Sequence, residues 1–114
     1  MHELGIVMNI VKTIENFSLD NNVTKVASIT LQVGELSSVV PRYLQECYPA
    51  ATYKSELLHK TKLNIEILPA NCICHSCEKV FSFKKHRNLC PLCGSNDSEI
   101  ISGKEFLIKE IEAC

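Results

Sequence analysis

The sequence predicts an α+β fold: a small, mainly antiparallel three-stranded sheet with two helices, plus an inserted four-cysteine module of zinc-ribbon type. Three observations carry this prediction. Apolar residues recur at helical spacing near the start, three later segments alternate apolar and polar residues, and two Cys-x-x-Cys pairs precede the last of them. At 114 residues the chain can form one compact unit, or a small domain with a metal-held module.

The first two elements are the most regular. Between Leu4 and Phe17 the apolar residues lie on one face of an amphipathic helix, and Asp20-Asn21-Asn22 supplies turn residues that end it. The stripe consists of Val7, Ile10, Val11, Ile14 and Phe17. From Val23 to Val33 the period changes to two, which indicates a strand whose apolar face holds Ala27, Ile29, Leu31 and Val33.

The remaining elements follow the same two patterns. A second helix is expected from about Pro41, with a kink or a division into two short helices at Pro49, because proline lacks the N–H donor that a helix needs. Alternation predicts strands at residues 63–67 and 105–111. We therefore expect an α+β domain at residues 1–69, completed by a C-terminal strand at 103–114, and a metal-binding domain at residues 70–102. That second stretch has few large apolar residues, so a metal should supply its folding energy.

Cys74/Cys77 and Cys90/Cys93 form the two cysteine pairs, which are separated by twelve residues. Four thiolates in a tetrahedron are typical of structural zinc, although this separation is shorter than the usual roughly 15–20 residues. Gly94 permits a positive φ after the last cysteine, a turn in which backbone N–H groups point at the sulfurs. Cys72 offers an alternative ligand, but only Cys74 completes a Cys-x-x-Cys pair. Disulfides are a weaker interpretation, because the seven cysteines are an odd number.

The amino terminus offers a second metal site. The Met1 amine, the His2 backbone nitrogen and the His2 imidazole can form adjacent chelate rings, and Glu3 can add a backbone or carboxylate ligand. Nitrogen donors in a square-planar arrangement suit Ni(II) or Cu(II). Taken alone, a histidine at position two is more often an exposed terminal residue.

The order of these blocks resembles the HypA/HybF family of nickel metallochaperones. Met1-His2-Glu3-Leu4, Val33-Gly34-Glu35-Leu36-Ser37 and the two cysteine pairs carry the resemblance, which spans essentially the whole chain. It implies Ni(II) as cargo bound by Met1, His2 and Glu3 in the first domain, and structural Zn(II) bound by Cys74, Cys77, Cys90 and Cys93. It also implies delivery to the large subunit of [NiFe]-hydrogenase with a HypB-type GTPase, and it leaves a homodimer open.

Other functions are less well supported. The net charge of −1 and the few aromatic residues argue against nucleic-acid binding, and no apolar run reaches the roughly 20 residues that span a bilayer. We expect a cytoplasmic location, because the start Met1-His2-Glu3-Leu4 lacks the basic residues of a secretory signal. We expect no enzymatic activity, because four thiolates leave zinc no open position for a reacting water. The alternative is a zinc-ribbon module that binds protein or nucleic acid without nickel. Its best support is the basic run Lys84-Lys85-His86-Arg87, which is more often a solvated loop.

Overall fold

The computed structural model describes residues 2–114, although not the side chain of His2. It contains two compact units. Unit 1 comprises Met1–Leu31, Ser38–Glu66 and Ile108–Cys114, and unit 2 comprises Gln32–Ser37 and Ile67–Leu107. Three of the four unit boundaries fall inside strands, namely β1 (Val26–Gly34), β2 (Lys62–Leu68) and β6 (Phe106–Ala113), and the fourth lies in the loop after β1. No helix in the described part of the chain is long and apolar enough to cross a membrane.

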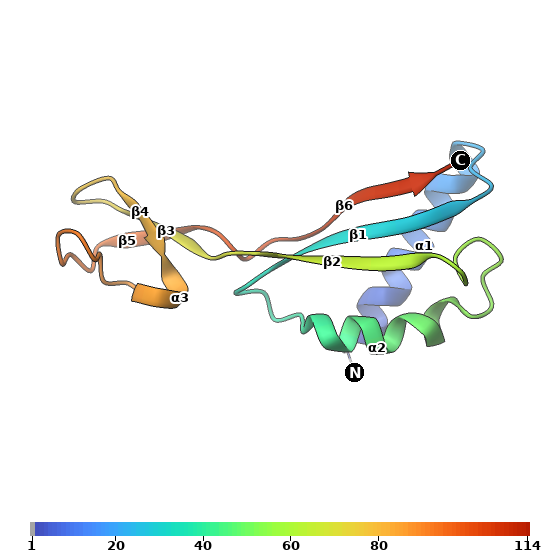
Figure 1. Ribbon diagram of the computed structural model, residues 1–114, viewed down its shortest axis with the longest axis horizontal. Helices are drawn as coiled ribbons and strands as arrows, with labels where there is room; N and C mark the ends of the chain where they lie inside the picture. The colour runs from blue at the N-terminus through green and yellow to red at the C-terminus, as the bar shows by residue number, and fades with distance from the viewer. Residues whose placement is uncertain (1) are drawn as a thin grey trace. The chain divides into compact units, whose positions relative to one another are not determined.

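The first sheet has the strand order β2-β1-β6, and helices α1 (His2–Asp20) and α2 (Pro41–Thr52) pack together beside it in unit 1 (Figure 1). The Cys114 N–H donates to the Lys25 carbonyl and the Gly34 N–H to the Glu105 carbonyl, so β1 and β6 are antiparallel. β1 and β2 run in the same direction, with α2 as the crossover between them (Figure 1). The α+β class is confirmed, and the direction of β2 is a detail that alternation does not specify.

Helix α1 buries most of the predicted stripe, including Val7, Val11 and Ile14. Phe17 is the exception, because 47% of it is exposed while Ser18 is only 4% exposed. The buried face follows the spacing 7, 11, 14, 18, which is the 3.6-residue period, and this places Phe17 at its margin. Phe17, which the spacing placed on the apolar stripe, is therefore not part of the buried face.

Strand β1 is the central strand of its sheet, and every residue of Ser28–Leu31 is buried although successive side chains point to opposite faces. The polar side chains there have partners: the Ser28 hydroxyl donates to the Glu112 carboxylate at 2.9 Å. Ala27, expected on the apolar face, is exposed instead. The predicted apolar residues Ile29, Leu31 and Val33 are buried.

Helix α2 continues through Pro49 as one helix, so the alternative of two short helices was wrong. The Tyr53 N–H still donates to the Pro49 carbonyl at 3.0 Å. Proline removes only one helical donor, and the buried residues on both sides of it hold the helix to the core. These are Leu44, Cys47, Tyr48 and Thr52.

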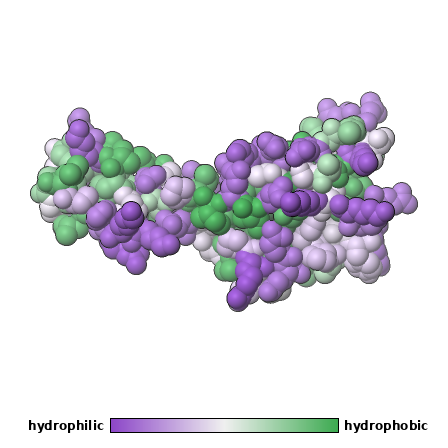
Figure 2. All heavy atoms as spheres, viewed as in Figure 1, coloured by the Kyte–Doolittle hydropathy of each residue, from purple (hydrophilic) through white to green (hydrophobic). Residues whose placement is uncertain are grey.

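Unit 2 contains a second antiparallel sheet that the sequence did not predict. Its strands are β3 (Asn71–Cys74), β4 (Val80–Ser82) and β5 (Ser98–Ser102), in the order β4-β3-β5, with the one-turn helix α3 (Phe83–His86) after β4. Its core is small and rich in sulfur, and consists of Cys72, Cys74, Phe81 and Cys90. Hydrophobic surface lies beside hydrophilic surface over this unit (Figure 2), and Val80, Leu89 and Leu92 are exposed.

The loop after β1 is fixed to the rest of unit 2 by backbone contacts. The Glu35 N–H donates to the Leu68 carbonyl and the Leu36 N–H to the Gly103 carbonyl, at 2.8 and 2.7 Å. Gly34 packs so closely that a Cβ atom on it would collide with the Gly103 carbonyl group. The Glu35 carboxylate also accepts a hydrogen bond from the Ala70 N–H at 3.0 Å. Glycine at position 34 is therefore a steric requirement.

Candidate metal centre

The four paired cysteines come together at one end of the second sheet. Their sulfur atoms all lie within 4.8 Å of one another, and the closest pairs are Cys74–Cys93 at 3.5 Å and Cys77–Cys90 at 3.6 Å. A regular tetrahedron with Zn–S bonds of about 2.3 Å has its sulfurs about 3.8 Å apart. The donor set therefore fits a tetrahedral thiophilic cation. It is the only group of three or more potential ligands found within the described part of the chain.

Two similar turns present these sulfurs, and we call residues 74–77 the first knuckle and residues 90–93 the second. In the first, the Glu78 N–H donates to the Cys74 carbonyl at 2.8 Å; in the second, the Gly94 N–H donates to the Cys90 carbonyl at 2.9 Å. The residue after each knuckle has a positive φ, 63° at Glu78 and 75° at Gly94. The predicted conformation of Gly94 is confirmed, whereas the first knuckle reaches it with a non-glycine residue, at some steric cost.

Backbone N–H groups also shape the acidity of the thiols. Hydrogen bonding from the Cys77 N–H is the main reason that the pKa of Cys74 is lowered to about 6. For Cys93 the Ser95 N–H acts in the lowering direction, but the neighbouring Cys74 thiol and burial outweigh it and raise the pKa to about 12. Four thiolates this close repel one another, so full deprotonation requires a cation among them.

Cys72 lies outside this group. It is fully buried, opposite Phe81 and Ile100 in the ladders of the second sheet, and burial raises the pKa of its thiol. The structure thus brings together the four cysteines of the two pairs and places Cys72 in the small core beside them. The other free cysteines, Cys47 and Cys114, do not belong to the group either.

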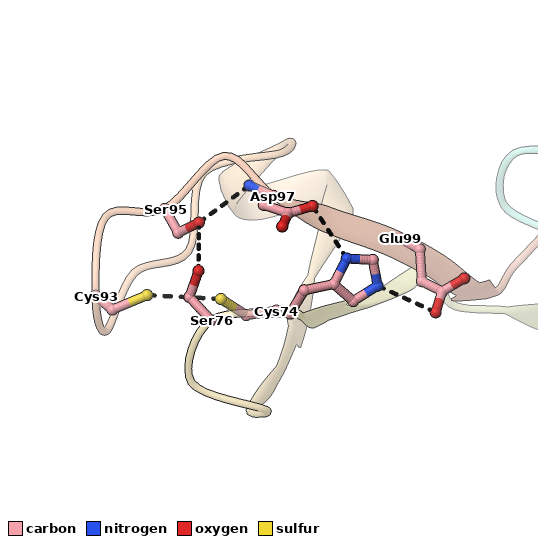
Figure 3. Close-up of polar contacts among 7 residues, drawn as sticks. Cys74, Ser76, Cys93, Ser95, Asp97 and Glu99 are labelled. Carbon is pink, nitrogen blue, oxygen red and sulfur yellow. Dashed lines mark hydrogen bonds and ion pairs between the residues drawn. The ribbon is translucent and has the colours of Figure 1, made fainter.

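Polar side chains surround the first knuckle (Figure 3). His75 Nδ1 lies 3.0 Å from the Asp97 carboxylate, and His75 Nε2 lies 3.2 Å from the Glu99 carboxylate. The hydrogen bond to Asp97, followed by that to Glu99, raises the pKa of His75. The sequence analysis did not identify the two acids. Their spacing of two residues, which puts both side chains on one side of an extended segment, is the signal that could have found them.

The amino-terminal site falls mostly outside the described structure. Met1 and the His2 side chain are not described, so the structure does not test their role in nickel binding. Helix α1 begins at His2, and Glu3 in its first turn is only 4% exposed. Glu3 is therefore a buried residue rather than a solvated acid.

The basic run forms helix α3 and the residue after it. The Lys84 ammonium lies 4.0 Å from the Glu35 carboxylate, and the Arg87 guanidinium lies over the Phe83 ring. Both contacts are made within unit 2. The His86 ring also packs edge-on against Phe81, so three residues of the run contact the unit's own residues, while the Lys84 side chain remains largely exposed.

Comparison with known proteins identifies the family. Residues 1–113 match the family model described as "Hydrogenase/urease nickel incorporation, metallochaperone, hypA". The chain is 35% identical to hydrogenase maturation factor HypA of Geobacter metallireducens, with 98% of each chain covered, and 34% identical to that of Actinobacillus succinogenes, with 97% covered.

Two solution structures share the fold. One is the Ni metallochaperone HypA from Helicobacter pylori, with a TM-score of 0.68, 20% identity, and coverage of 97% of this chain and 96% of that one. The other is described as HypA protein, with a TM-score of 0.74, 21% identity, and coverage of 100% and 97%. Family model, relatives and fold agree over nearly the whole length. The chain belongs to the HypA family of nickel metallochaperones for hydrogenase maturation.

Proposed function

We propose that this chain binds Ni(II) reversibly at its amino terminus and helps to insert it into the large subunit of [NiFe]-hydrogenase. The observation that carries the proposal is the family match, which begins at residue 1 and so includes the Met1-His2-Glu3 start. The ligands are the Met1 amine, the His2 amide nitrogen and the His2 imidazole. Nitrogen donors of this kind favour Ni(II) in a square-planar arrangement.

The position of these residues at a helix start supports the ligand set. The first four N–H groups of a helix have no partner within the helix, so the His2 amide can take part in coordination without breaking a helical hydrogen bond. The helix dipole puts partial positive charge at this end, which opposes a bound cation, and the Glu3 carboxylate in the first turn offsets it. Because Glu3 is buried, we assign it this electrostatic role or coordination through its backbone.

We further propose that Cys74, Cys77, Cys90 and Cys93 hold Zn(II). The spacing of the four sulfurs supports this ion, and the small core of unit 2 explains why it is needed. When bound, zinc supplies folding free energy to the unit and no reaction chemistry. The chain's own contribution is to point backbone N–H groups at the sulfurs and to bury Cys74 and Cys90.

The partners and location follow from the family. We propose a HypB-type GTPase as the protein that cooperates in delivery, and the cytoplasm as the place where it occurs. The alternative, a zinc-ribbon module without nickel function, is less well supported, because the family model that matches residues 1–113 is that of a nickel metallochaperone.

A nickel titration of the zinc-loaded chain with its native amino terminus tests the proposal. The wild type should bind nickel, and His2→Ala or a Gly-Ser extension before Met1 should abolish binding while zinc content stays unchanged. His59→Ala, which removes an exposed histidine elsewhere in unit 1, is the matched control. Nickel binding by His2→Ala that equals the wild type would refute the amino-terminal site.

A further inference from the structure

The two residues inside the first knuckle both contact the segment that follows the second knuckle. The His75 N–H donates to the Asp97 carbonyl at 2.9 Å, in addition to the side-chain contacts with Asp97 and Glu99. The Ser76 hydroxyl donates to the Ser95 hydroxyl at 3.0 Å. Figure 3 shows the side-chain contacts beside the Cys74–Cys93 pair. Residues 75 and 76 thus connect the two halves of the cysteine group without contributing a ligand.

Ser95 is the centre of this arrangement. Its hydroxyl accepts hydrogen bonds from Ser76 and from the Asp97 N–H, the latter at 3.1 Å, and its carbonyl accepts one from the Cys90 N–H at 2.9 Å. The contact with Cys90 lies inside the second half, whereas the contact with Ser76 crosses to the first. A shift of one knuckle away from the other would therefore break the bonds of Ser76 and His75 together.

We propose that His75 and Ser76 are positioning residues for the zinc site, which hold the two cysteine pairs at metal-binding distance and slow the loss of zinc. This inference rests on the proposed function of the four cysteines as zinc ligands. Zinc is released when the thiolates move away from it. The two cysteine pairs lie on different segments of the chain, with Cys77 and Cys90 thirteen positions apart in the sequence. Contacts that keep those segments together oppose this separation.

The expected effect is moderate, because the contacts are open to solvent. The side chains of His75, Asp97 and Glu99 are 45%, 71% and 62% exposed, and single surface contacts of this kind contribute little. Contacts that break together act jointly, however. We expect about a 3- to 10-fold faster zinc loss for the double variant His75→Ala/Ser76→Ala, below the 10- to 100-fold typical of residues bonded directly to metal ligands.

The test measures zinc transfer from the full zinc-loaded chain to an excess of a chromophoric chelator. Leu92→Ala is the matched control, because Leu92 occupies the corresponding place in the second knuckle, is 70% exposed and has an apolar side chain that forms no hydrogen bonds. His75→Asn is the conservative variant, since its amide can still donate to Asp97. It should restore part of the slow release that His75→Ala loses. The Co(II)-substituted proteins should all keep tetrahedral thiolate absorption bands, which shows that the site itself still forms.

The outcomes distinguish failure of the zinc site from failure of the positioning role. If the wild type holds no zinc, or holds it without protecting four thiols, the proposed zinc site fails. If the wild type holds zinc but the double variant releases it at the rate of Leu92→Ala, the zinc site stands and the positioning role of His75 and Ser76 is refuted. The role is also refuted if His75→Asn releases zinc as fast as His75→Ala.

Discussion

Replacing Cys72 or Cys74 by alanine should affect zinc binding differently, although the two residues are close neighbours in the sequence. Cys72→Ala removes one buried heavy atom from the small core between Phe81 and Ile100. A buried group of this size contributes about 0.8 kcal/mol by transfer, and the remaining cavity brings the total loss of stability to about 1–2 kcal/mol. Cys74→Ala removes a metal ligand instead. Structural zinc binds with about 10–16 kcal/mol, so an equal share for each of four thiolates is about 3 kcal/mol, or more than 100-fold in affinity.

The assay is competition for zinc between each variant and a chelator of known affinity, combined with metal content and thermal unfolding of the zinc-loaded protein. Cys72→Ala should retain one zinc at nearly wild-type affinity and unfold at a lower temperature. Cys74→Ala should lose zinc affinity by two orders of magnitude or more. Equal zinc loss in both variants would show that Cys72 is a ligand and that the grouping of the four paired sulfurs is wrong.

Three further predictions concern the backbone and the metal. Gly94→Ala should lower the free energy of unfolding by about 1 kcal/mol through its φ of 75° alone, because an added Cβ meets nothing within 4 Å. Glu78→Gly at the matching turn should be neutral or stabilising, because glycine adopts a positive φ without steric cost. Denaturant unfolding that ranks the two variants in reverse order would contradict this. Gly34→Ala should destabilise the chain by about 2–3 kcal/mol or more, because the new Cβ meets the Gly103 backbone. Gly5→Ala, on the exposed surface of a helix, is its control. Similar unfolding midpoints for the two variants would be inconsistent with the close packing at Gly34. Removing zinc with a strong chelator should abolish hydrogen-exchange protection in β3–β5 while α1 keeps its protection, and an equal loss in both would contradict the dependence of unit 2 alone on the metal.

The sequence predicted unit 1 well because its elements are long enough to show their period. Helix α1 spans five turns, and its apolar spacing was legible except at Phe17, where one residue of drift decides exposure. Pro49 misled the prediction, because buried residues on both sides keep α2 continuous despite the lost donor. The burial of Ser28 was also missed, because its polar partner Glu112 lies far away in sequence.

In unit 2 the ligand positions were predictable and their surroundings were not. Regular spacing identified the two cysteine pairs, but strands of three to five residues are too short to show alternation. In addition, Cys72 and Cys74 act as the buried residues of β3, a role usually taken by aliphatic side chains. The contacts of His75 with Asp97 and Glu99 join residues more than twenty positions apart, and only the pairing of β3 with β5 brings them together.

The strand order of the first sheet has a consequence for the order of events during synthesis. Strand β1 is central and its partner β6 is the last element of the chain, whereas all four paired cysteines precede β6. As the chain leaves the ribosome, the cysteine group is therefore complete before β1 can acquire its second neighbour. Metal capture by unit 2 can begin on the nascent chain, and unit 1 closes only once β6 has emerged.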